Sequence, residues 1–582
     1  MLKKLVHNGI LIPEPPKYHK VTLKIRDEHR ELTPKQEEMA YAWAKKQGTP
    51  YVEDLVFVKN FMQDFSAALG IRPVLKIDEV DFGPLIDIVN AERAAREAMS
   101  KEDRKLLALK RKEIREELKA MYGFAETDEE RIELASYMTE PSGIFMGRGK
   151  HPLRGRWKEG AQKSDVTLNL SPDAPVPEGD WQEMVWQPES LWVAKWEDKL
   201  SSKLKYIWLH DTAPVKQARE AKKFDKAHEL KSRIDKVRNH IEEGLKSDEF
   251  KTRKIATACF LIDALCLRVG DEKDPEEADT VGATTLRPEH IKILNDGYVE
   301  FRFLGKDSVL WDKKIKLPNY VIKNLKELSE NARPSSSDNG RVKHAAYNKP
   351  QLFPDITSRN VNAYLSQAMK GLTAKVFRTF HATNVVKGTL EKANVKYADP
   401  EYVKWEAVVN ANMEAAILCN HTKQPPKNWA ERKEKFRDRE KSAKDKIKQI
   451  QEQIKTLKEE LSVLKNEFKE KKAAVSKRDQ KQKIQERYEK KIQSKASQLE
   501  KTLEREEKAH HALGKVKVQR AIASQNRTWN LGTSQKSYID PRVFYQWGKA
   551  VNYDVLEKYY STTLRRKFMW VREQDEDASE SA

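Results

Sequence analysis

The segment from Trp429 to Asn526 constrains the fold of this 582-residue chain more than any other part of the sequence. It contains no proline and one glycine, and Lys, Glu, Gln, Arg and Ala dominate it. Apolar residues recur in it at alternating steps of three and four, the spacing of a helix that packs along one face. The first series is Ile447, Ile450, Ile454, Leu457, Leu461, Leu464 and Phe468. The second series is Ile484, Tyr488, Ile492, Ala496, Leu499 and Leu503.

A polar break at Ser476–Gln480 separates the two series. Two apolar seams on either side of a short break predict an antiparallel helical hairpin, in which the chain folds back on itself. The alternative is a parallel homodimer, in which the break would interrupt one continuous zipper. A long solvated hairpin also accounts for the charged fraction of 34%, which is too high for one uniform globule.

Composition narrows the class of protein further. Lys and Arg number 110 against 90 Asp and Glu, so the formal net charge is +20 and a polyanion is the expected partner. The N-terminus has too short and too interrupted an apolar stretch for a signal peptide, and the most apolar window, Ala256–Leu267, is too short to span a bilayer. We therefore expect an intracellular protein with reduced thiols and without a disulfide framework. The three cysteines are Cys259, Cys266 and Cys419.

Outside the hairpin the sequence predicts a mixture of strands and helices. Alternating apolar residues predict strands over 21–25, 165–170 and 297–305. Residues 91–118, charged and rich in alanine, predict one helix on the surface, and the proline-rich residues 172–180 predict a loop. The last 55 residues, 528–582, predict a small helical unit whose acidic tail, from Glu573 onward, is disordered.

Several familiar sequence signatures are absent, which excludes whole classes of enzyme. The sequence has no GxxxxGK[ST], no HExxH, no Cys/His zinc spacing and no GxGxxG after a strand. The acidic stretch 270–277 could be imagined as a metal site, but carboxylates without a preorganised partner are more often a solvated loop. We therefore expect neither a metal nor a cofactor.

A set of cationic residues stands at the ends of predicted elements. Arg268 follows an apolar helix, Lys306 lies at the tip of a predicted hairpin, and Arg378 and His421 lie in the blocks GLTAKVFRTF and AILCNHTKQPPK. Tyr538 lies beyond the long hairpin in LGTSQKSYIDPRV. Taken one at a time, each residue is more often a helix cap, a surface charge or a packing residue than a catalytic group.

Taken in order, the blocks LRVGDEK, ADTVGATTLRPEHI, FLGKDS, GLTAKVFRTF, AILCNHTKQPPK and LGTSQKSYIDPRV resemble eukaryotic-type DNA topoisomerase I, the type IB family. The resemblance begins near residue 1, includes GIFMGRGKHP at 143–152, and runs through the C-terminal region. It implies a monomer that encircles duplex DNA and relaxes supercoils of either sign without ATP or metal, through a 3′-phosphotyrosyl intermediate. It implies a catalytic set of Arg268, Lys306, Arg378, His421 and the nucleophile Tyr538.

The same resemblance implies an α+β multidomain clamp with a mostly helical catalytic core related to tyrosine recombinases. The expected parts are a core subdomain over 1–17 and 106–218, a cap over 18–105, a catalytic core over 219–424, an antiparallel coiled-coil linker over 425–527, and a small helical C-terminal domain over 528–582. The expected DNA contacts are Arg148, Lys150, His151, Lys216, Lys273, Thr280, Asp307, Ser308, Asn362, Lys375 and Thr379.

Three residues depart from the family pattern. Ser537 stands where Asn usually precedes the nucleophile, Gln535 stands where Lys is usual, and Asp271 stands where Asn usually follows the first catalytic Arg. These departures put camptothecin-like inhibitor sensitivity and the tuning of religation in doubt. The sequence also lacks the long charged N-terminal tail that carries nuclear targeting in eukaryotic members. Two interpretations stay open: an archaeal-type member at a nucleoid in the cytoplasm, or a eukaryotic protein of the nucleus.

Two other functions compete with this one. A tyrosine recombinase shares the Arg-Lys-Arg-His-Tyr chemistry, but the long linker between His421 and Tyr538 and the extensive N-terminal region favour the topoisomerase. A non-enzymatic DNA-binding or scaffolding protein fits the composition equally well, and only the ordered catalytic blocks argue against it.

Overall fold

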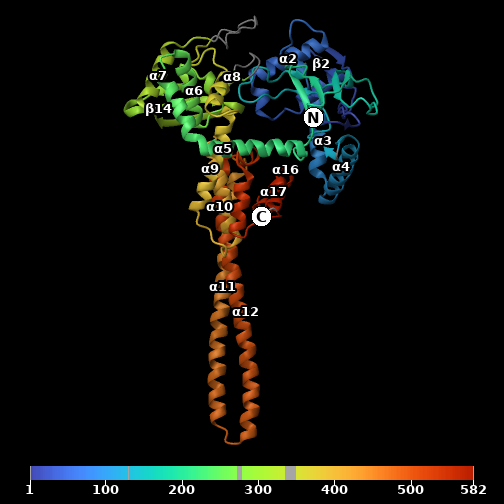
Figure 1. Cartoon of the computed structure of the whole chain (residues 1–582). Helices are drawn as coiled ribbons and strands as arrows, with labels where there is room; N and C mark the ends of the chain where they lie inside the picture. The colour runs from blue at the N-terminus through green and yellow to red at the C-terminus, as the bar shows by residue number, and fades with distance from the viewer. Residues whose placement is uncertain (1, 129, 272–277, 335–348, 581–582) are drawn as a thin grey trace. The chain divides into compact units, whose positions relative to one another are not determined.

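The computed structural model describes the chain except for residues 1, 129, 272–277, 335–348 and 581–582 and the side chains of 576–580. Internal contacts divide the chain, shown in Figure 1, into two compact units. Unit 1 comprises Met1–Lys226, Arg233–Ile262 and Arg268–Ala374. Unit 2 comprises Ala227–Ser232, Asp263–Leu267 and Lys375–Ala582.

The N-terminal part of unit 1 packs two helices with a small antiparallel sheet. Helix α1 (Pro34–Ala44) begins with a capping box, in which the side chains of Thr33 and Gln36 each accept a backbone N–H of the other residue. Helix α2 (Leu55–Leu69) is capped by Asp54. The predicted strand over 21–25 is confirmed as β2, the central strand of the sheet β3-β2-β4. The bounds are β2 Thr22–Ile25, β3 Glu28–Glu31 and β4 Val80–Asp81.

Two helices follow where the sequence predicted one over 91–118. Helix α3 spans Gly83–Ala98 and helix α4 spans Lys101–Tyr122. The side chain of Ser100 accepts the N–H of Asp103 at 3.0 Å and so caps the first turn of α4. The prediction of one helix was wrong because an N-cap of this kind starts a new helix without changing the charge pattern on either side.

A four-stranded sheet, β10-β9-β11-β12, forms the second core of unit 1. The predicted strand over 165–170 is confirmed as β9, whose four residues are all buried. Strands β9 and β10 are parallel, and β11 is antiparallel to both its neighbours. The proline-rich segment 172–180 is a loop, as predicted. The bounds are β9 Val166–Asn169, β10 Glu183–Val185, β11 Trp192–Glu197 and β12 Leu204–Trp208.

Short strands complete this part of unit 1. Strands β1, β5 and β6 form an antiparallel sheet, and β7 pairs with β8. Their bounds are β1 Leu5–Val6, β5 Phe124–Thr127, β6 Arg131–Glu133, β7 Gly143–Ile144 and β8 Trp157–Lys158.

The C-terminal part of unit 1 carries the antiparallel sheet β13-β14-β15. The predicted strand over 297–305 is confirmed as β14, and the tip of its hairpin with β15 is Lys306–Ser308. None of the helices in the described part of the chain is both long enough and apolar enough to cross a membrane. The bounds are β13 Ile291–Ile293, β14 Tyr298–Gly305, β15 Val309–Lys316, α5 Pro214–Leu245, α6 Phe250–Leu265, α7 Asn319–Glu330 and α8 Ser358–Ala368.

Unit 2 builds its core from helices. Fully buried Asn412 on α10 donates to the hydroxyl of Tyr559 at 2.7 Å, and the ammonium of Lys404 donates to the carbonyl of Tyr397 at 2.7 Å. These bonds satisfy polar groups that burial would otherwise destabilise. All three cysteines are buried and free of disulfide bonds. The helices are α9 Ala374–Lys392, α10 Glu401–Leu418, α13 Leu531–Ser537, α14 Pro541–Ala550, α15 Val555–Lys558, α16 Thr562–Lys567 and α17 Trp570–Glu580.

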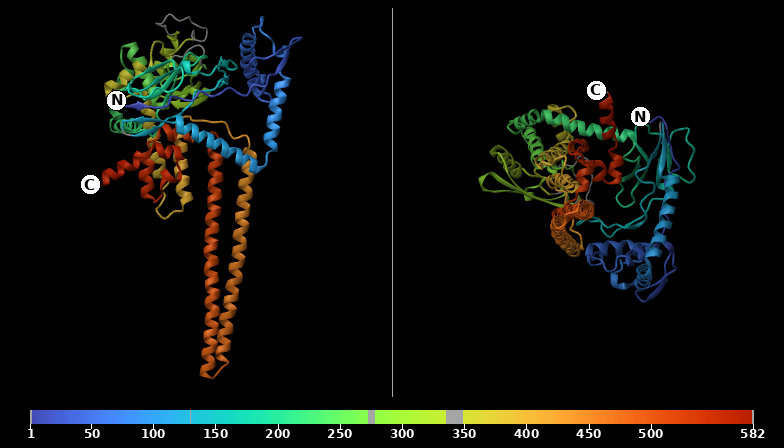
Figure 2. Two further views of the ribbon diagram at one scale, coloured as in Figure 1. Left: turned by 90° about the vertical axis from the view of Figure 1, so that its right-hand side faces the viewer. Right: turned by 90° about the horizontal axis from the view of Figure 1, so that it is seen from below.

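The predicted long helices are α11 (Trp429–Ala473) and α12 (Arg478–Gln525), which lie side by side in Figure 1 and in the left view of Figure 2. They run antiparallel within one chain, joined by a short turn. Ion pairs cross between them, with Arg520 to Glu440 at 2.5 Å. The apolar contact between them near the rest of unit 2 is made by Ile447, Ile450, Ile454, Leu499, Ala509 and Leu513.

The acidic C-terminal tail is helical up to residue 580, as part of α17. The prediction of disorder from Glu573 onward was therefore wrong for these residues. Buried Trp570 and Val571 anchor the start of the helix, and the Lys549 ammonium pairs with Asp575 at 2.7 Å. Composition did not reveal these tertiary contacts, which fix the helix at its N-terminal end.

Candidate active site

Tyr538 lies directly after helix α13, where it serves as the C-terminal cap residue. Its N–H donates to the carbonyl of Ser534 at 2.9 Å, and its side chain is half-buried. The hydroxyl of Thr383 on α9 donates to the carbonyl of Tyr538 at 3.4 Å and accepts the N–H of Asp540 at 3.1 Å. The backbone on both sides of the phenol is therefore tied to the neighbouring helix.

Arg378 brings a guanidinium to the phenol from α9. It is 2% exposed, its Nη1 lies 3.5 Å from the Tyr538 hydroxyl oxygen, and its Cζ lies 4.9 Å from the ring centroid. Its Nη2 donates to the carbonyl of Cys419 at 2.6 Å, which fixes the plane of the guanidinium. Its Nε is buried and has no hydrogen-bond partner among the described residues. A buried donor of this kind is suited to an anion that arrives with a substrate.

His421 completes this cluster from the segment after α10. Its ring stacks on that of Tyr538, with centroids 5.5 Å apart and planes 27° apart, and it is 6% exposed. Its Nδ1 lies 2.7 Å from the Ser534 hydroxyl, and its carbonyl accepts the N–H of Asn530 at 2.7 Å. The structure therefore brings Arg378, His421 and Tyr538 together within unit 2, as a phenol flanked by two cationic or hydrogen-bonding groups.

Arg268 and Lys306 belong to unit 1. Arg268 is half-buried and follows α6 after a left-handed residue, Cys266, with φ 53°. Lys306 is exposed at the tip of the β14–β15 hairpin. Within unit 1, the N–H of Val281 donates to the carbonyl of Leu304, two positions before Lys306. The N–H of Ala283 donates to the carbonyl of Arg268. Convergence of all five predicted catalytic residues on one phosphate stays a prediction.

Three of the expected DNA contacts meet near the same hairpin tip. The guanidinium of Arg148 pairs with the carboxylate of Asp307, and the Ser308 hydroxyl lies 3.5 Å from the Arg148 carbonyl. Arg148 and Lys150 are exposed, and the ring of His151 lies edge-on to Phe145.

The other expected contacts differ in how far their side chains can reach a ligand. The ammonium of Lys216 donates to the Leu209 carbonyl at 2.6 Å, and the Asn362 side chain accepts the N–H of Ala374 at the start of α9. Thr379 is fully buried, whereas Lys375 is exposed and Thr280 half-buried. Lys273 and most of the acidic stretch 270–277 lie outside the described residues. Contact with DNA stays a prediction for all of them.

One departure from the family pattern has a structural role, and a second lies buried. The carboxylate of Asp271 accepts the N–H of Ser358 at 2.7 Å, at the start of α8, where negative charge stabilises a helix. Gln535 is buried in α13. In the described part of the chain, no group of three or more His, Cys, Asp or Glu side chains could hold a metal ion.

Sequence reasoning missed the groups that support these residues. The Ser534 hydroxyl contacts the His421 imidazole, and the Thr383 hydroxyl donates to the Tyr538 carbonyl. Helical spacing offered a weak signal for Ser534, four residues before Tyr538. Nothing in the order of the residues indicates that Thr383 lies near the site.

Comparisons with known proteins assign nearly the whole chain to one family. Residues 212–461 match the family described as eukaryotic DNA topoisomerase I, catalytic core; residues 2–209 match its DNA binding fragment; and residues 510–579 match a C-terminal topoisomerase domain. The chain is 32% identical to DNA topoisomerase 1 of Homo sapiens over 597 residues, covering 99% of this chain and 71% of that protein. It is 31% identical to DNA topoisomerase 1 beta of Arabidopsis thaliana over 584 residues, covering 98% of this chain and 59% of that protein.

These matches, which extend over nearly the whole chain, place it among the DNA topoisomerases, with duplex DNA as its partner. It belongs to the eukaryotic DNA topoisomerase I family, the type IB enzymes. The resemblance inferred from the ordered sequence blocks is confirmed.

Proposed function

We propose that this topoisomerase nicks one strand of duplex DNA through a 3′-phosphotyrosyl bond to Tyr538, lets the DNA swivel, and religates it without ATP or metal. The observation that carries the proposal is the direct contact of the Tyr538 phenol with the Arg378 guanidinium and the His421 ring. Supercoils of both signs would relax, because swivelling follows the torsional stress in the DNA.

The phenol needs this electrostatic support. An ordinary phenol, with a pKa of about 10, is about 0.1% ionised at pH 7, so forming the phenolate costs roughly 4 kcal/mol. Nearby cationic donors favour the charged form and reduce that cost. The Nη1 of the Arg378 guanidinium lies 3.5 Å from the hydroxyl oxygen of Tyr538.

In the proposed cleavage step, the Tyr538 phenol gives its proton to water, its oxygen bonds to phosphorus, and the bond from phosphorus to the 5′ oxygen breaks. Arg268, Arg378 and His421 would hold the charge that spreads over the non-bridging oxygens, because guanidinium forks engage two phosphate oxygens at once. Lys306 would protonate the departing 5′ oxygen as the general acid. One phosphodiester replaces another of similar energy, so religation needs no nucleotide.

The remaining expectations concern how the protein holds DNA. The expected phosphate and sugar contacts position the duplex without reading its sequence, so binding should be weakly sequence-specific and strongly dependent on salt. A monomer that encircles the duplex, in the nucleus or at a nucleoid, fits this role. Lysines near the tip of the α11–α12 hairpin would slow the rotating DNA, unless they merely solvate the helices. These lysines are Lys469, Lys471, Lys472 and Lys477.

Relaxation of a negatively supercoiled plasmid in EDTA, without nucleotide, tests the proposal. Wild-type protein should relax the plasmid completely, and Tyr538→Phe should leave it supercoiled while still binding DNA. Relaxation that requires magnesium or ATP would reject the mechanism. Joint products between two DNA sites would instead indicate a recombinase.

A further inference from the structure

A short segment of unit 1 joins the backbones that carry Arg268 and Lys306. We call residues 279–287 the bridging loop. The N–H of Val281 donates at 2.8 Å to the carbonyl of Leu304, a residue of β14 that lies two positions before Lys306. The N–H of Ala283 donates to the carbonyl of Arg268 at 2.9 Å. The bridging loop therefore bonds directly to the Arg268 backbone on one side and to the hairpin strand on the other.

The loop packs so closely against the Arg268 segment that it has little freedom to shift. A Cβ on Gly282 would lie 2.5 Å from Gly270 Cα and 2.9 Å from the Arg268 carbonyl oxygen, distances that no side chain tolerates. Gly270 itself has φ 82°, which glycine adopts without strain. Because the two backbones are in contact, a displacement of the loop would move the backbone of Arg268 as well.

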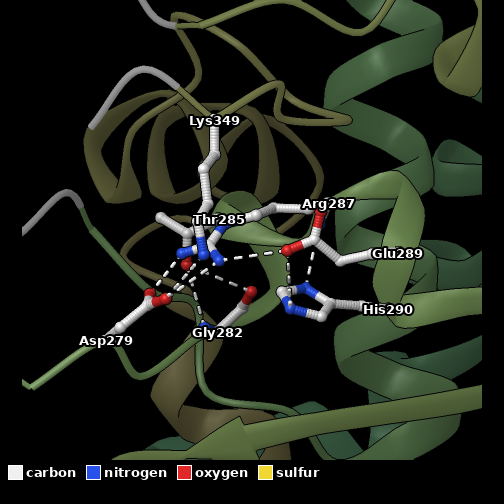
Figure 3. Close-up of polar contacts among 7 residues, drawn as sticks. All are labelled: Asp279, Gly282, Thr285, Arg287, Glu289, His290 and Lys349. Carbon is white, nitrogen blue, oxygen red and sulfur yellow. Dashed lines mark hydrogen bonds and ion pairs between the residues drawn. The ribbon is translucent and has the colours of Figure 1, made fainter. Parts of the chain in front are cut away.

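An ion pair closes the bridging loop at its two ends. Figure 3 shows the Arg287 guanidinium facing both carboxylate oxygens of Asp279, with the Glu289 carboxylate on its other side. One prong, from Arg287 Nη1 to Asp279, measures 3.0 Å, and the contact to Glu289 measures 3.3 Å. The Lys349 ammonium reaches Asp279 at 3.4 Å. Arg287 is only 9% exposed, so its charge depends on these carboxylates.

Neighbouring groups also interact with the ion pair and with the loop that it closes. Burial would by itself raise the pKa of Asp279, but the hydrogen bonds and charge of Arg287 outweigh burial and lower the pKa. Burial and the charge of Arg287 lower the pKa of His290 to about 4, so its ring is neutral and Nδ1 accepts the Arg287 N–H at 3.1 Å. Inside the loop, the Thr285 hydroxyl accepts the N–H of Gly282 at 2.9 Å.

We propose that the Asp279–Arg287 ion pair is a positioning pair: through the bridging loop it sets the placement of Arg268 and Lys306 relative to each other. The pair contacts neither catalytic side chain in the proposed reaction; it acts through the backbone bonds of Val281 and Ala283. The inference rests on the catalytic roles proposed for Arg268 and Lys306. It adds a specific cause for their geometry, in the backbone bonds of the bridging loop.

The test measures cleavage and binding separately on the full chain. Asp279→Asn removes the charge of the pair with little change in shape. At saturating protein, its single-turnover cleavage rate on a duplex that cannot religate should fall about 10- to 100-fold, the scale expected for catalytic groups displaced by an ångström. Duplex affinity, measured in the Tyr538→Phe background, should fall by much less than the cleavage rate, because most of the expected phosphate contacts lie outside the bridging loop.

A modified substrate distinguishes positioning from general destabilisation. A 5′-bridging sulfur leaves as a thiolate, with a pKa of about 8.5, and so needs no proton from a general acid. If Asp279→Asn displaces Lys306, its loss of cleavage rate should be smaller on the sulfur substrate than on the oxygen substrate. The loss that remains on the sulfur substrate would come from the displacement of Arg268. A variant that is merely unstable would lose the same factor on both substrates, and that result would overturn the proposal.

Two further variants keep the test decisive. Arg302→Gln removes an exposed ion pair, 3.8 Å from Asp312 on the same hairpin, and should cleave at the wild-type rate. Arg287→Lys keeps the charge but loses the two-pronged contact, and should show a smaller defect of the same kind even if Asp279→Asn fails to fold. Wild-type cleavage together with undiminished cleavage by Arg287→Lys and Asp279→Asn would reject the positioning role. Absence of wild-type cleavage would instead reject the proposed function.

Discussion

The two groups of predicted catalytic residues are built in different ways. In unit 2, the side chains of Arg378 and His421 each contact that of Tyr538, and both are almost fully buried. In unit 1, Arg268 is half-buried and Lys306 is exposed, and backbone hydrogen bonds of the bridging loop link their segments.

This difference indicates what fixes the positions of the side chains in each group. Buried side chains that are fixed by packing and hydrogen bonds are preorganised before a substrate arrives, which is where electrostatic catalysis gains most. An exposed lysine on a hairpin tip has rotamer freedom, so its average position depends on its backbone. We therefore expect the unit 2 group to be sensitive to direct neighbours, and the unit 1 group to be sensitive to a loop that does not contact the substrate.

The largest expected effect on the cleavage rate concerns Lys306, the exposed residue of the unit 1 group. Lys306→Ala should lower the cleavage rate about 10²- to 10⁴-fold, the usual contribution of a general acid, and the loss should shrink on a 5′-bridging sulfur substrate. The control is Lys316→Ala, an exposed lysine on the same hairpin. Equal losses on the oxygen and sulfur substrates would show that Lys306 is not the proton donor.

The next effect concerns the buried side. Arg378→Lys should lower the single-turnover cleavage rate about 10²- to 10³-fold, because a lysine cannot contact both the Cys419 carbonyl and a phosphate in the same plane. The matched control on α9 is Lys387→Ala, which loses only an exposed contact to Glu391 at 3.9 Å. If Arg378→Lys cleaved like the wild type, a point charge would suffice and the planar fork would be unimportant.

A smaller effect should come from the hydroxyl that holds the imidazole. Ser534→Ala removes the 2.7 Å contact to His421 Nδ1 and should slow cleavage about fivefold to tenfold, the value of one hydrogen bond. Thr533→Ala, at the preceding position of α13, is the control. The test compares the single-turnover cleavage rates of the two variants at saturating protein, and Ser534→Ala should be the slower. Equal rates would mean that stacking on Tyr538 alone orients the ring.

The last prediction concerns stability and should have the smallest effect on activity. The free energy of unfolding should depend on pH through a histidine of unit 1. Burial lowers the pKa of His7 to about 4, and its ring bonds the Asn169 carbonyl at 3.1 Å while neutral. Between pH 6.5 and about 4 the unfolded chain takes up a proton that the folded chain refuses. The contribution of His7 to the free energy of unfolding is therefore full above pH 6.5. It falls by at most about 3 kcal/mol as the pH drops towards 4.

Denaturant unfolding across this pH range checks the prediction. His7→Gln should flatten the loss of stability between pH 6.5 and 4, whereas His29→Gln, at an exposed position on β3, should leave the slope unchanged. Plasmid relaxation at pH 7.5 should be the same for both variants. An unchanged slope in His7→Gln would show that His7 does not stay neutral in the folded protein.

Local patterns predicted those elements whose own residues determine them. Alternation identified β2, β9 and β14, and the spacing of Ile447, Ile450 and Ile454 identified the long helices. The break at Ser100 escaped because a cap is a property of one side chain and one N–H. The acidic end of α17 was misjudged because Trp570 and Lys549 stabilise it from outside the tail.

The candidate site was predicted by the order of its sequence blocks rather than by geometry. The blocks point to Arg378, His421 and Tyr538 although the first and the last are 160 positions apart, because the resemblance supplied the connection. The groups that hold the site, such as Ser534 and the Asp279–Arg287 pair, depend on how distant segments approach. No periodicity or composition in a single sequence encodes that approach.

The central claim is that the phenol at position 538 forms the covalent bond to DNA. It is tested most directly by stopping the reaction with denaturant on a duplex labelled at its 3′ end or its 5′ end, and then mapping the modified peptide. The account predicts that protein is joined to the 3′ phosphate of the nicked strand, through the peptide that contains Tyr538, with no adduct in Tyr538→Phe. An adduct on the 5′ end, or on any other residue, would contradict it.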